Sequence, residues 1–446
     1  MIRVAEHLKN EPSDLAAYWM PFTANRAFQR RPRMVVSAKG MHYTTSDGRQ
    51  VIDATSGLYC VNAGHGREEI AAAIKEAAYR LDYAPAFQFG HPQAFELANR
   101  LTALAPVGLD HVFFSNSGSE AVDTAMKIAL AYHRQRGEGQ RTRFIGRERG
   151  YHGVGFGGLS VGGVPANRRD FGTLLPGIDH LRCTYDREHQ SFAIGEPEWG
   201  RELADELEQL VALHGASNIA AVVVEPIAGS TGCLPPPKGY LERLREITKR
   251  HGILLIFDEV ITAFGRTGYG FASERYGLTP DIIAFAKGVT NGAVPFAGTL
   301  VCGDIHAALM TGPEHAPEFF HGYTYSGHPL ATAAAMATLD IYRDEALFER
   351  ASTLEEVFAD VMMEMQSMPI VLDIRPIGLM CGIDIEPSAR GPGVRGYELL
   401  QRAFHDHDLY VRVINDTMIV APSLIATIDE LTDIRDRALG ALKSLS

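Results

Sequence analysis

The chain has 446 residues, of which 46% are hydrophobic and 22% are charged, a composition that predicts a folded protein with a large buried core. Its formal net charge of −12 is spread along the sequence without a block of Lys or Arg, which argues against nucleic acid as a partner. The five cysteines lie far apart and form no CxxC pair, so we expect reduced thiols, no disulfide framework and no bound metal.

The N-terminal segment lacks the apolar stretch of a signal peptide, and no apolar run approaches the length needed to span a bilayer. These two features predict a cytoplasmic protein that does not bind membranes.

Helix and strand patterns alternate over most of the chain. Apolar residues recur at helical spacing in 68–81, and the short apolar run 111–114 leads into a Ser-Asn-Ser-Gly-Ser stretch, which is typical of a buried strand that runs into a helix. Further strands are predicted at 143–146, 220–224, 253–257, 282–286 and 298–302, with helices such as 202–213 and 240–251 between several of them. This alternation predicts an α/β fold with a mostly parallel sheet covered on both faces.

The pattern changes after about residue 329. Two long helices are predicted at 331–342 and 347–368, followed by short strands near 380–385 and 418–421. We therefore expect residues 61–329 to form a large domain. Residues 1–60 and 330–446 are then expected to supply a smaller α+β domain.

Two predicted strands end in chemically capable side chains. Strand 253–257 runs into Asp258, and strand 282–286 runs into Lys287. Carboxyl ends of parallel strands meet at one edge of an open α/β sheet, where ligands bind. Alone, Asp258 also fits a simple turn cap and Lys287 a solvated strand end. Their pairing favours a lysine with a lowered pKa that acts as a nucleophile.

Two further segments fit pyridoxal phosphate, which needs a lysine for covalent attachment, an acid beside its pyridine nitrogen and a cradle for its phosphate. Ser117, Gly118 and Ser119 follow strand 111–114 and open the next helix, where free N–H groups favour an anion. An ordinary helix cap is the alternative interpretation. Tyr151 stands in a glycine-rich loop and can stack on a flat ring, although the same sequence also fits a plain loop.

A longer stretch resembles a known family. Residues 256–268 (IFDEVITAFGRTG), with Lys287 twenty-nine positions after Asp258, are similar to the signature of the class III (ω-type) aminotransferases. The resemblance extends from about Trp19 into the C-terminal lobe, and it is closest to the ω-amino acid:pyruvate (β-alanine:pyruvate) subgroup. It implies the fold of pyridoxal-phosphate-dependent transferases of fold type I, with a large domain and a smaller lobe.

The resemblance also implies roles for the candidate residues. Lys287 would bind the cofactor and Asp258 would hold the pyridine nitrogen protonated, so these two are the expected catalytic residues. The other expected cofactor contacts are Ser117, Gly118, Ser119, Tyr151, Glu225, Val260 and, reaching the site of the partner subunit, Thr324. The expected substrate pocket is lined by Phe22, Tyr59, Arg412 and the partner's Phe87. The functional unit would then be a homodimer or a dimer of dimers.

Two departures from the family pattern bear on the substrate. Ser230 stands where ornithine and GABA aminotransferases carry a glutamate that pairs with a carboxylate-binding arginine, and Ile419 and Val420 stand where that arginine is expected. Arg412 resembles instead the movable carboxylate receptor of the ω-amino acid:pyruvate subgroup, with a solvated strand residue as the alternative. Tyr59 replaces the tryptophan of many relatives, which leaves the range of amines open.

The expected activity is transfer of the amino group of an ω-amino acid or primary amine, such as β-alanine, to pyruvate, giving an aldehyde or ketone and L-alanine. An aminomutase or racemase of the same fold is the alternative, because it would use the same cofactor residues without consuming a keto acid. A non-catalytic or dinucleotide-binding α/β protein is a second alternative. The glycine-rich stretch 153–163 lacks GxGxxG after a strand, however, and that class gives no role to Lys287.

Overall fold

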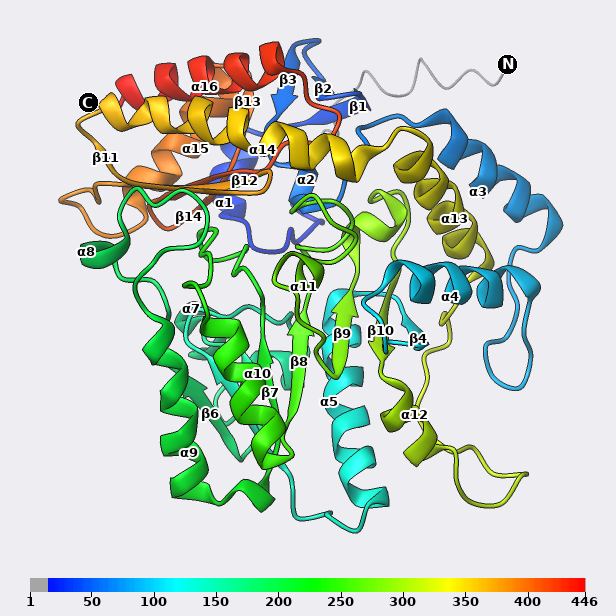
Figure 1. Cartoon of the computed structure of the whole chain (residues 1–446). Helices are drawn as coiled ribbons and strands as arrows, with labels where there is room; N and C mark the ends of the chain where they lie inside the picture. The colour runs from blue at the N-terminus through cyan, green and yellow to red at the C-terminus, as the bar shows by residue number, and fades with distance from the viewer. Residues whose placement is uncertain (1–14, 446) are drawn as a thin grey trace.

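The computed structural model describes residues 15–445, and at its centre is a seven-stranded sheet in the order β4-β10-β9-β8-β7-β5-β6 (Figure 1). Five neighbouring strands, β9, β8, β7, β5 and β6, run parallel to one another. Strand β10 runs antiparallel to both β9 and β4. Their bounds are β4 (His111–Ser115), β5 (Arg143–Arg147), β6 (Ile178–Leu181), β7 (Ile219–Val224), β8 (Leu254–Asp258), β9 (Ile282–Phe285) and β10 (Ala297–Val301). The mostly parallel α/β sheet expected from the sequence is confirmed.

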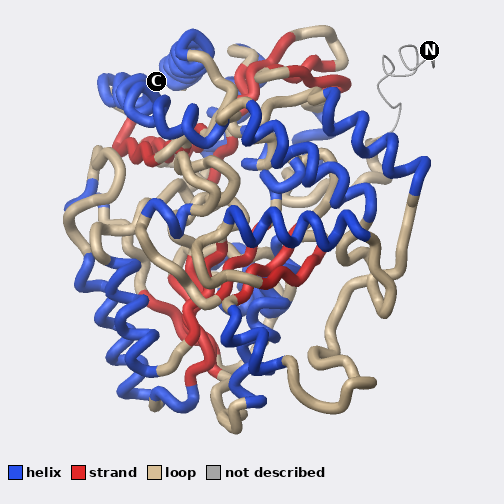
Figure 2. The backbone as a smooth tube through the Cα atoms, turned by 45° about the vertical axis from the view of Figure 1, so that its right-hand side comes forward, coloured by secondary structure: helices blue, strands red, loops and turns tan. Residues whose placement is uncertain are grey.

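Helices cover both faces of this sheet because its central strands are apolar on both sides. In β7, Val222 packs into one core together with α9 (Glu206–His214) and α10 (Tyr240–His251), while Ala221 packs into a second core against α5 (Gly118–Gln135). Figure 2 shows the strands enclosed between these helices. The arrangement leaves the strand ends as the place where polar side chains can gather.

Two smaller sheets, built from the N-terminal and C-terminal parts of the described chain, lie beyond one end of the large sheet (Figure 1). One has the order β1-β2-β3-β13, with β13 parallel to β3, and the other has the order β11-β12-β15-β14. Their strands are β1 (Val35–Lys39), β2 (His42–Thr45), β3 (Gln50–Asp53), β11 (Val371–Ile377), β12 (Met380–Ile385), β13 (Leu409–Tyr410), β14 (Arg412–Ile414) and β15 (Thr417–Val420). A smaller α+β lobe built from both terminal segments is therefore confirmed.

The remaining helices complete the two parts. The longer ones are α3 (Glu68–Arg80), α4 (Pro92–Leu104), α13 (Pro329–Asp344), α14 (Leu347–Met363), α15 (Val394–Asp406) and α16 (Ile428–Lys443). The shorter ones are α1 (Asn25–Arg30), α2 (Ser56–Tyr59), α6 (Phe156–Val161), α7 (Pro165–Arg168), α8 (Arg187–Gln190), α11 (Ala272–Arg275), α12 (Gly303–Leu309), η1 (Arg201–Asp205), η2 (Ala216–Asn218), η3 (Lys287–Thr290) and η4 (Glu364–Ser367). None of the helices in residues 15–445 is long and apolar enough to cross a membrane.

Some elements differ from the sequence expectation. The helix predicted at 202–213 is divided into η1 and α9, and the helix predicted at 347–368 ends in η4. Strand β6 was not predicted because it is a half-buried edge strand with the sequence IDHL, which carries no clear apolar pattern. The division of the chain at residues 60 and 329 into two domains stays a proposal.

Candidate active site

Asp258 and Lys287 stand at the ends of adjacent parallel strands. Asp258 is the last residue of β8 and pairs in register with Ala284 of β9, and Lys287 follows the end of β9 by two residues. Asp258 is buried and Lys287 is half-buried. The sheet therefore brings the acid and the lysine to one edge, as the sequence predicts.

A strained turn presents Lys287. Its φ of 52° lies in the left-handed region, which residues with side chains rarely adopt, and the phenol of Tyr342 donates a hydrogen bond of 2.6 Å to the carbonyl of the next residue, Gly288. Burial lowers the pKa of the Lys287 ammonium; the Arg412 cation also lowers it, whereas Cys60 and Asp258 raise it. A lowered pKa makes the neutral amine available as a nucleophile and a base.

His152 lies against Asp258. Its Nδ1 is 2.9 Å from Oδ2 of Asp258, and the backbone N–H of Val260 donates to the other carboxylate oxygen at 3.1 Å. The imidazole is 1% exposed, so this pair lies almost entirely out of water. The contacts fix the direction of the Asp258 carboxylate.

The first turn of α5 supplies the expected anion site. Ser117 is the N-cap of this helix, and its Oγ accepts a hydrogen bond of 3.2 Å from the N–H of Glu120. Helix geometry leaves the N–H groups of Gly118 and Ser119 without intrahelical acceptors. A phosphate is favoured there by these donors and by the helix dipole, while Ser117 carries out the local capping that was its alternative role.

Two glycines allow the backbone to come close around this turn. A Cβ on Gly118 would lie 3.0 Å from the side chain of Val260, and a Cβ on Gly153 would lie 2.4 Å from Oγ of Ser119. Ser119 also accepts a hydrogen bond of 3.0 Å from the N–H of Val154. The loop after β5 is thereby tied to the start of α5.

Glu225 connects the Tyr151 loop to the sheet. It follows β7 directly, and its carboxylate accepts hydrogen bonds of 2.9 Å from the N–H of Tyr151 and 3.2 Å from the N–H of Gly229. Burial raises the pKa of Glu225 to about 7, against the opposing effect of His152. The carboxyl group therefore holds the loop in place at the cavity edge.

These residues surround a cavity of about 120 Å³. All of the predicted cofactor contacts line it except Ser117 and Thr324. Four further residues that were not predicted also line the cavity: His152, Gly153, Ile261 and Ala286. His152 and Gly153 stand beside Tyr151 in the same glycine-rich motif, which was the available signal for both.

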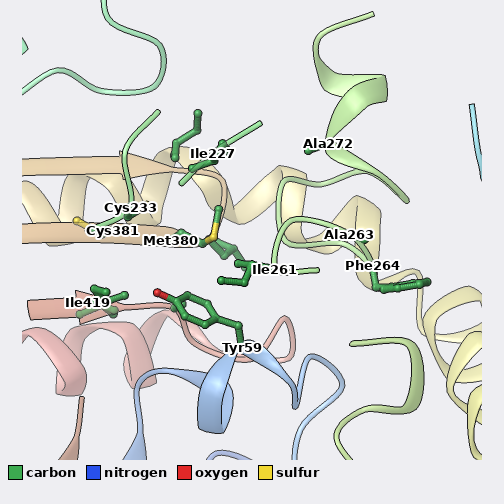
Figure 3. Close-up of a cluster of buried hydrophobic side chains, with 14 of the residues drawn as sticks. Tyr59, Ile227, Cys233, Ile261, Ala263, Phe264, Ala272, Met380, Cys381 and Ile419 are labelled. Atoms are coloured by element: carbon green, nitrogen blue, oxygen red, sulfur yellow. The ribbon is translucent and has the colours of Figure 1, made fainter. Parts of the chain in front are cut away.

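Two predicted substrate residues lie close to the cavity without lining it. Tyr59 is buried, and its hydroxyl donates a hydrogen bond of 3.1 Å to the carbonyl of Gly229. Figure 3 shows its ring within a cluster of buried apolar side chains. Arg412 is half-buried at the start of β14, and its Nε is buried without a hydrogen-bond partner in the described part of the chain. Burial raises the pKa of Tyr151, and Arg412 is near enough to oppose that effect.

The other three predicted residues lie on the surface. Phe22 is 78% exposed and Phe87 is 57% exposed, and the backbone of Thr324 accepts a hydrogen bond of 3.0 Å from the hydroxyl of Tyr83. A Cβ on Gly322 would meet the Phe87 ring at 2.8 Å, so Phe87 lies against the loop that carries Thr324. None of the three lines the cavity. The expected roles of Phe87 and Thr324 depend on a partner subunit, and the roles of all three residues stay predictions.

The residues around the cavity fit pyridoxal phosphate. Lys287 offers an amine with a lowered pKa, Asp258 offers a buried carboxylate, and the start of α5 offers N–H donors that favour a phosphate. Tyr151 offers a flat side chain at the same cavity. Fold and site together define an enzyme of the pyridoxal-phosphate type with its lysine on a parallel sheet.

Comparison with known proteins agrees with this class. The chain matches the family "Aminotransferase class-III" over residues 23–442. It is 56% identical to an omega-aminotransferase of Caulobacter vibrioides, over 96% of this chain and 98% of the relative, and 47% identical to a beta-alanine–pyruvate aminotransferase of Pseudomonas aeruginosa, over 97% of each. The crystal structure of an (S)-enantioselective omega-transaminase from Thermomicrobium roseum matches it with a TM-score of 0.91 at 34% identity, over 96% of both chains.

The chain therefore belongs to the class III aminotransferases. Members of this family depend on pyridoxal phosphate, which confirms the cofactor and the fold type expected from the sequence.

Proposed function

We propose that this aminotransferase takes the amino group of an ω-amino acid or primary amine, β-alanine among them, and delivers it to pyruvate. The products are an aldehyde or ketone and L-alanine. The names of two relatives, omega-aminotransferase and beta-alanine–pyruvate aminotransferase, support this substrate class. The carrying observation is the cavity that brings together the amine of Lys287 and the carboxylate of Asp258.

The proposed roles follow from the geometry of the site. Pyridoxal phosphate supplies the electron sink of the reaction when it is bound. Lys287 holds the cofactor and then takes a proton from the amine-bearing carbon of the substrate, a task that suits an amine with a lowered pKa. Asp258, directed by His152 and Val260, keeps the pyridine nitrogen protonated. The start of α5 binds the phosphate through Gly118 and Ser119, with Ser117 beside them.

Arg412 is the proposed receptor for substrate carboxylates. No ion pair within residues 15–445 includes it, and its Nε is buried without a hydrogen-bond partner there. A guanidinium without an acid is available for the planar carboxylate of pyruvate or β-alanine. Because Arg412 lowers the pKa of Lys287, it lies within electrostatic reach of the amine that reacts.

The remaining proposals concern the walls of the pocket and the assembly. Tyr59 and Phe22 would border the substrate in one subunit, while the partner's Phe87 and the partner's Thr324 would complete the pocket and the phosphate site. Phe22 and Phe87 are exposed in the single chain, and large exposed apolar side chains favour a surface that a partner subunit covers. This exposure supports a homodimer or a dimer of dimers. We also propose that the enzyme works in the cytoplasm.

An amino-donor screen tests the activity. Purified enzyme with pyridoxal phosphate is given pyruvate and one donor at a time, including β-alanine, diamines and arylalkylamines, and L-alanine is measured together with the aldehyde or ketone. We expect the two products in equal amounts, and none from Lys287→Ala. An isomerase would convert the amine without consuming pyruvate, so product formation that is independent of pyruvate would refute the proposal.

A further inference from the structure

A guanidinium without an acidic partner lies in the interior of the molecule. Arg266, eight positions after Asp258, is 0% exposed, and no ion pair within residues 15–445 includes it. Its two terminal nitrogens donate to four neutral oxygens at distances between 2.5 and 3.1 Å, while its Nε is buried without a hydrogen-bond partner in the described residues. The four acceptors are the carbonyls of Leu379 and Pro422, the hydroxyl of Ser56 and the side-chain oxygen of Asn62. Burying an unpaired charge is costly, so these contacts point to a specific task for the side chain.

Two of the four contacts clamp the turn that carries Tyr59. The φ angles of Ser56, Gly57 and Tyr59 are 45°, 67° and 61°, all in the left-handed region. Side-chain residues rarely adopt this region, so the turn keeps its shape only where the surroundings hold it. Asp53 also holds this turn, since its carboxylate accepts a hydrogen bond of 2.6 Å from the N–H of Gly57. A buried cation and a buried carboxylate thus fix the turn together.

The turn determines where the Tyr59 ring lies. Figure 3 shows the ring beside Ile261 and Ile419, which belong to the same buried cluster. Its hydroxyl reaches the carbonyl of Gly229, whose N–H in turn donates to Glu225 at the cavity. A change in the turn would therefore move the ring and disturb the support of the cavity wall.

The other contacts join the same guanidinium to the segment near Arg412. Pro422 follows β15, and β15 pairs with β14 through Arg412 and Ile419. Ser56 adds a second link, because its hydroxyl donates to the carbonyl of Ala421 at 2.5 Å. The turn that carries Tyr59 and the β14–β15 hairpin that carries Arg412 are thus both linked to the side chain of Arg266.

We propose that Arg266 is a positioning residue that sets Tyr59 against Arg412 and thereby determines the size of amine that the site accepts. The inference rests on the proposed function, in which these two residues border the substrate. A lysine cannot replace the guanidinium, because one ammonium nitrogen cannot reach all four oxygens.

Two test variants and one control variant separate a positioning role of Arg266 from a general role in stability. Arg266→Lys keeps the charge and loses the four-way contact, and Ser56→Ala removes the hydroxyl that Arg266 and Ala421 share. Arg350→Lys is the control. Arg350 donates to three neighbouring carbonyls of the C-terminal segment, those of Leu424, Ile425 and Ala426, without touching the turn.

The first measurement does not depend on the activity of the enzyme. Hydrogen exchange of the cofactor-free proteins is followed by mass spectrometry over residues 54–62. We expect faster exchange in Arg266→Lys and Ser56→Ala and unchanged exchange in Arg350→Lys, because the turn amides of Tyr59 and Cys60 are held by the carbonyls of Thr55 and Ser56.

The second measurement is selectivity between two neutral donors of different size, sec-butylamine and 1-phenylethylamine. The donor half-reaction is followed by the spectral change of the bound cofactor, so the result does not depend on pyruvate. We expect the ratio of the two kcat/KM values to change by about tenfold or more in both test variants, because small displacements of a pocket wall have effects of this size. The ratio should stay unchanged in Arg350→Lys.

If both test variants keep the kcat/KM ratio of the two donors and the hydrogen exchange of residues 54–62 unchanged, the proposal is overturned and Arg266 is a purely structural residue. If Arg266→Lys does not fold, the same comparison with Ser56→Ala decides the question. Failure of the proposed function is recognised separately, because it would show in the wild-type protein as an absence of L-alanine from pyruvate with every donor.

Discussion

Nδ1 of His152 lies 2.9 Å from Oδ2 of Asp258, with both side chains buried at the carboxyl end of the central sheet. The loop after β5 must pass the end of β7 to make this contact, because β7 lies between β5 and β8 in the sheet. The hydrogen bond orients a carboxylate that the proposed mechanism requires in one direction.

His152→Phe tests the value of this orientation. Losing a hydrogen bond to a buried carboxylate costs about 1.5–3 kcal/mol, which corresponds to a fall in kcat of about tenfold to a hundredfold. The cofactor should remain attached to Lys287, since that residue is untouched. His133→Phe is a matched control, because His133 is equally buried but bonds to Ala220 rather than to the cavity. Equal losses of kcat in the two variants would contradict the prediction.

Lys287→Ala should remove the covalent attachment of the cofactor. We expect the purified wild-type enzyme to be yellow, to lose its colour on borohydride reduction and to carry the reduced adduct on the peptide containing Lys287. The variant should show no adduct and no turnover. Lys249→Ala, on the exposed end of α10, should behave as the wild type does. A reducible chromophore with full turnover in Lys287→Ala would assign the attachment to another lysine.

Parts of this site were predictable from sequence because they depend on local rules. Asp258 and Lys287 each end an apolar strand, and parallel strands bring such ends together. Ser117 likewise had the sequence pattern of a helix cap, and the structure shows it capping α5. These conclusions need only the order of strands and helices.

Other parts depend on how distant segments meet, which the sequence pattern does not specify. The contact of His152 with Asp258 spans 106 residues, and the links of Arg266 to Ser56 and Pro422 span 210 and 156. No periodicity marks such pairs. Tyr59 shows the same limit, because nothing in its local sequence indicates that its hydroxyl donates to the carbonyl of Gly229, 170 residues further along the chain.

The raised pKa of Glu225 predicts a pH-dependent stability. Burial raises this pKa from its ordinary value of 4.5 to about 7. Between these pH values the unfolded chain releases a proton that the folded chain retains. The contribution of Glu225 to stability is therefore greatest below pH 4.5 and is lost as the pH rises through 7. The loss is about 3 kcal/mol for this one group.

Glu225→Gln isolates that contribution, because all other titrating groups are present in both proteins. Chemical denaturation of the two cofactor-free proteins at several pH values should show the wild type losing stability relative to the variant as the pH rises to 7. Above pH 7 the difference should be constant. Two parallel curves over the whole range would mean that Glu225 has the same pKa in the folded and unfolded chains, and that burial does not raise it.

The proposed role of Thr324 predicts complementation between inactive subunits. Lys287→Ala and Thr324→Ala, mixed and reassembled, should form heterodimers in which one site has an intact lysine and an intact threonine from the partner. With random exchange about a quarter of wild-type activity should return. Lys287→Ala mixed with Asp258→Ala should recover none, because both residues belong to the site of one chain. Full activity in a protein that sediments strictly as a monomer would refute the shared site.

Arg412→Ala should separate carboxylate substrates from neutral amines. Pyruvate and β-alanine would lose a two-pronged partner, whereas 1-phenylethylamine has no charge for the guanidinium to bind. We expect a loss of about 2–4 kcal/mol in the half-reactions with the two carboxylates and a much smaller loss with the neutral amine. Single-turnover rates with each substrate measure the three values separately, and Arg350→Ala serves as a control for the loss of an arginine in the same lobe.

Arg412 also lowers the pKa of Lys287, so its removal should raise that pKa and shift the pH profile of the neutral-amine half-reaction upward without abolishing it. Equal losses for all three substrates would show that Arg412 supports the structure of the site, and its role as a carboxylate receptor would have to be given up.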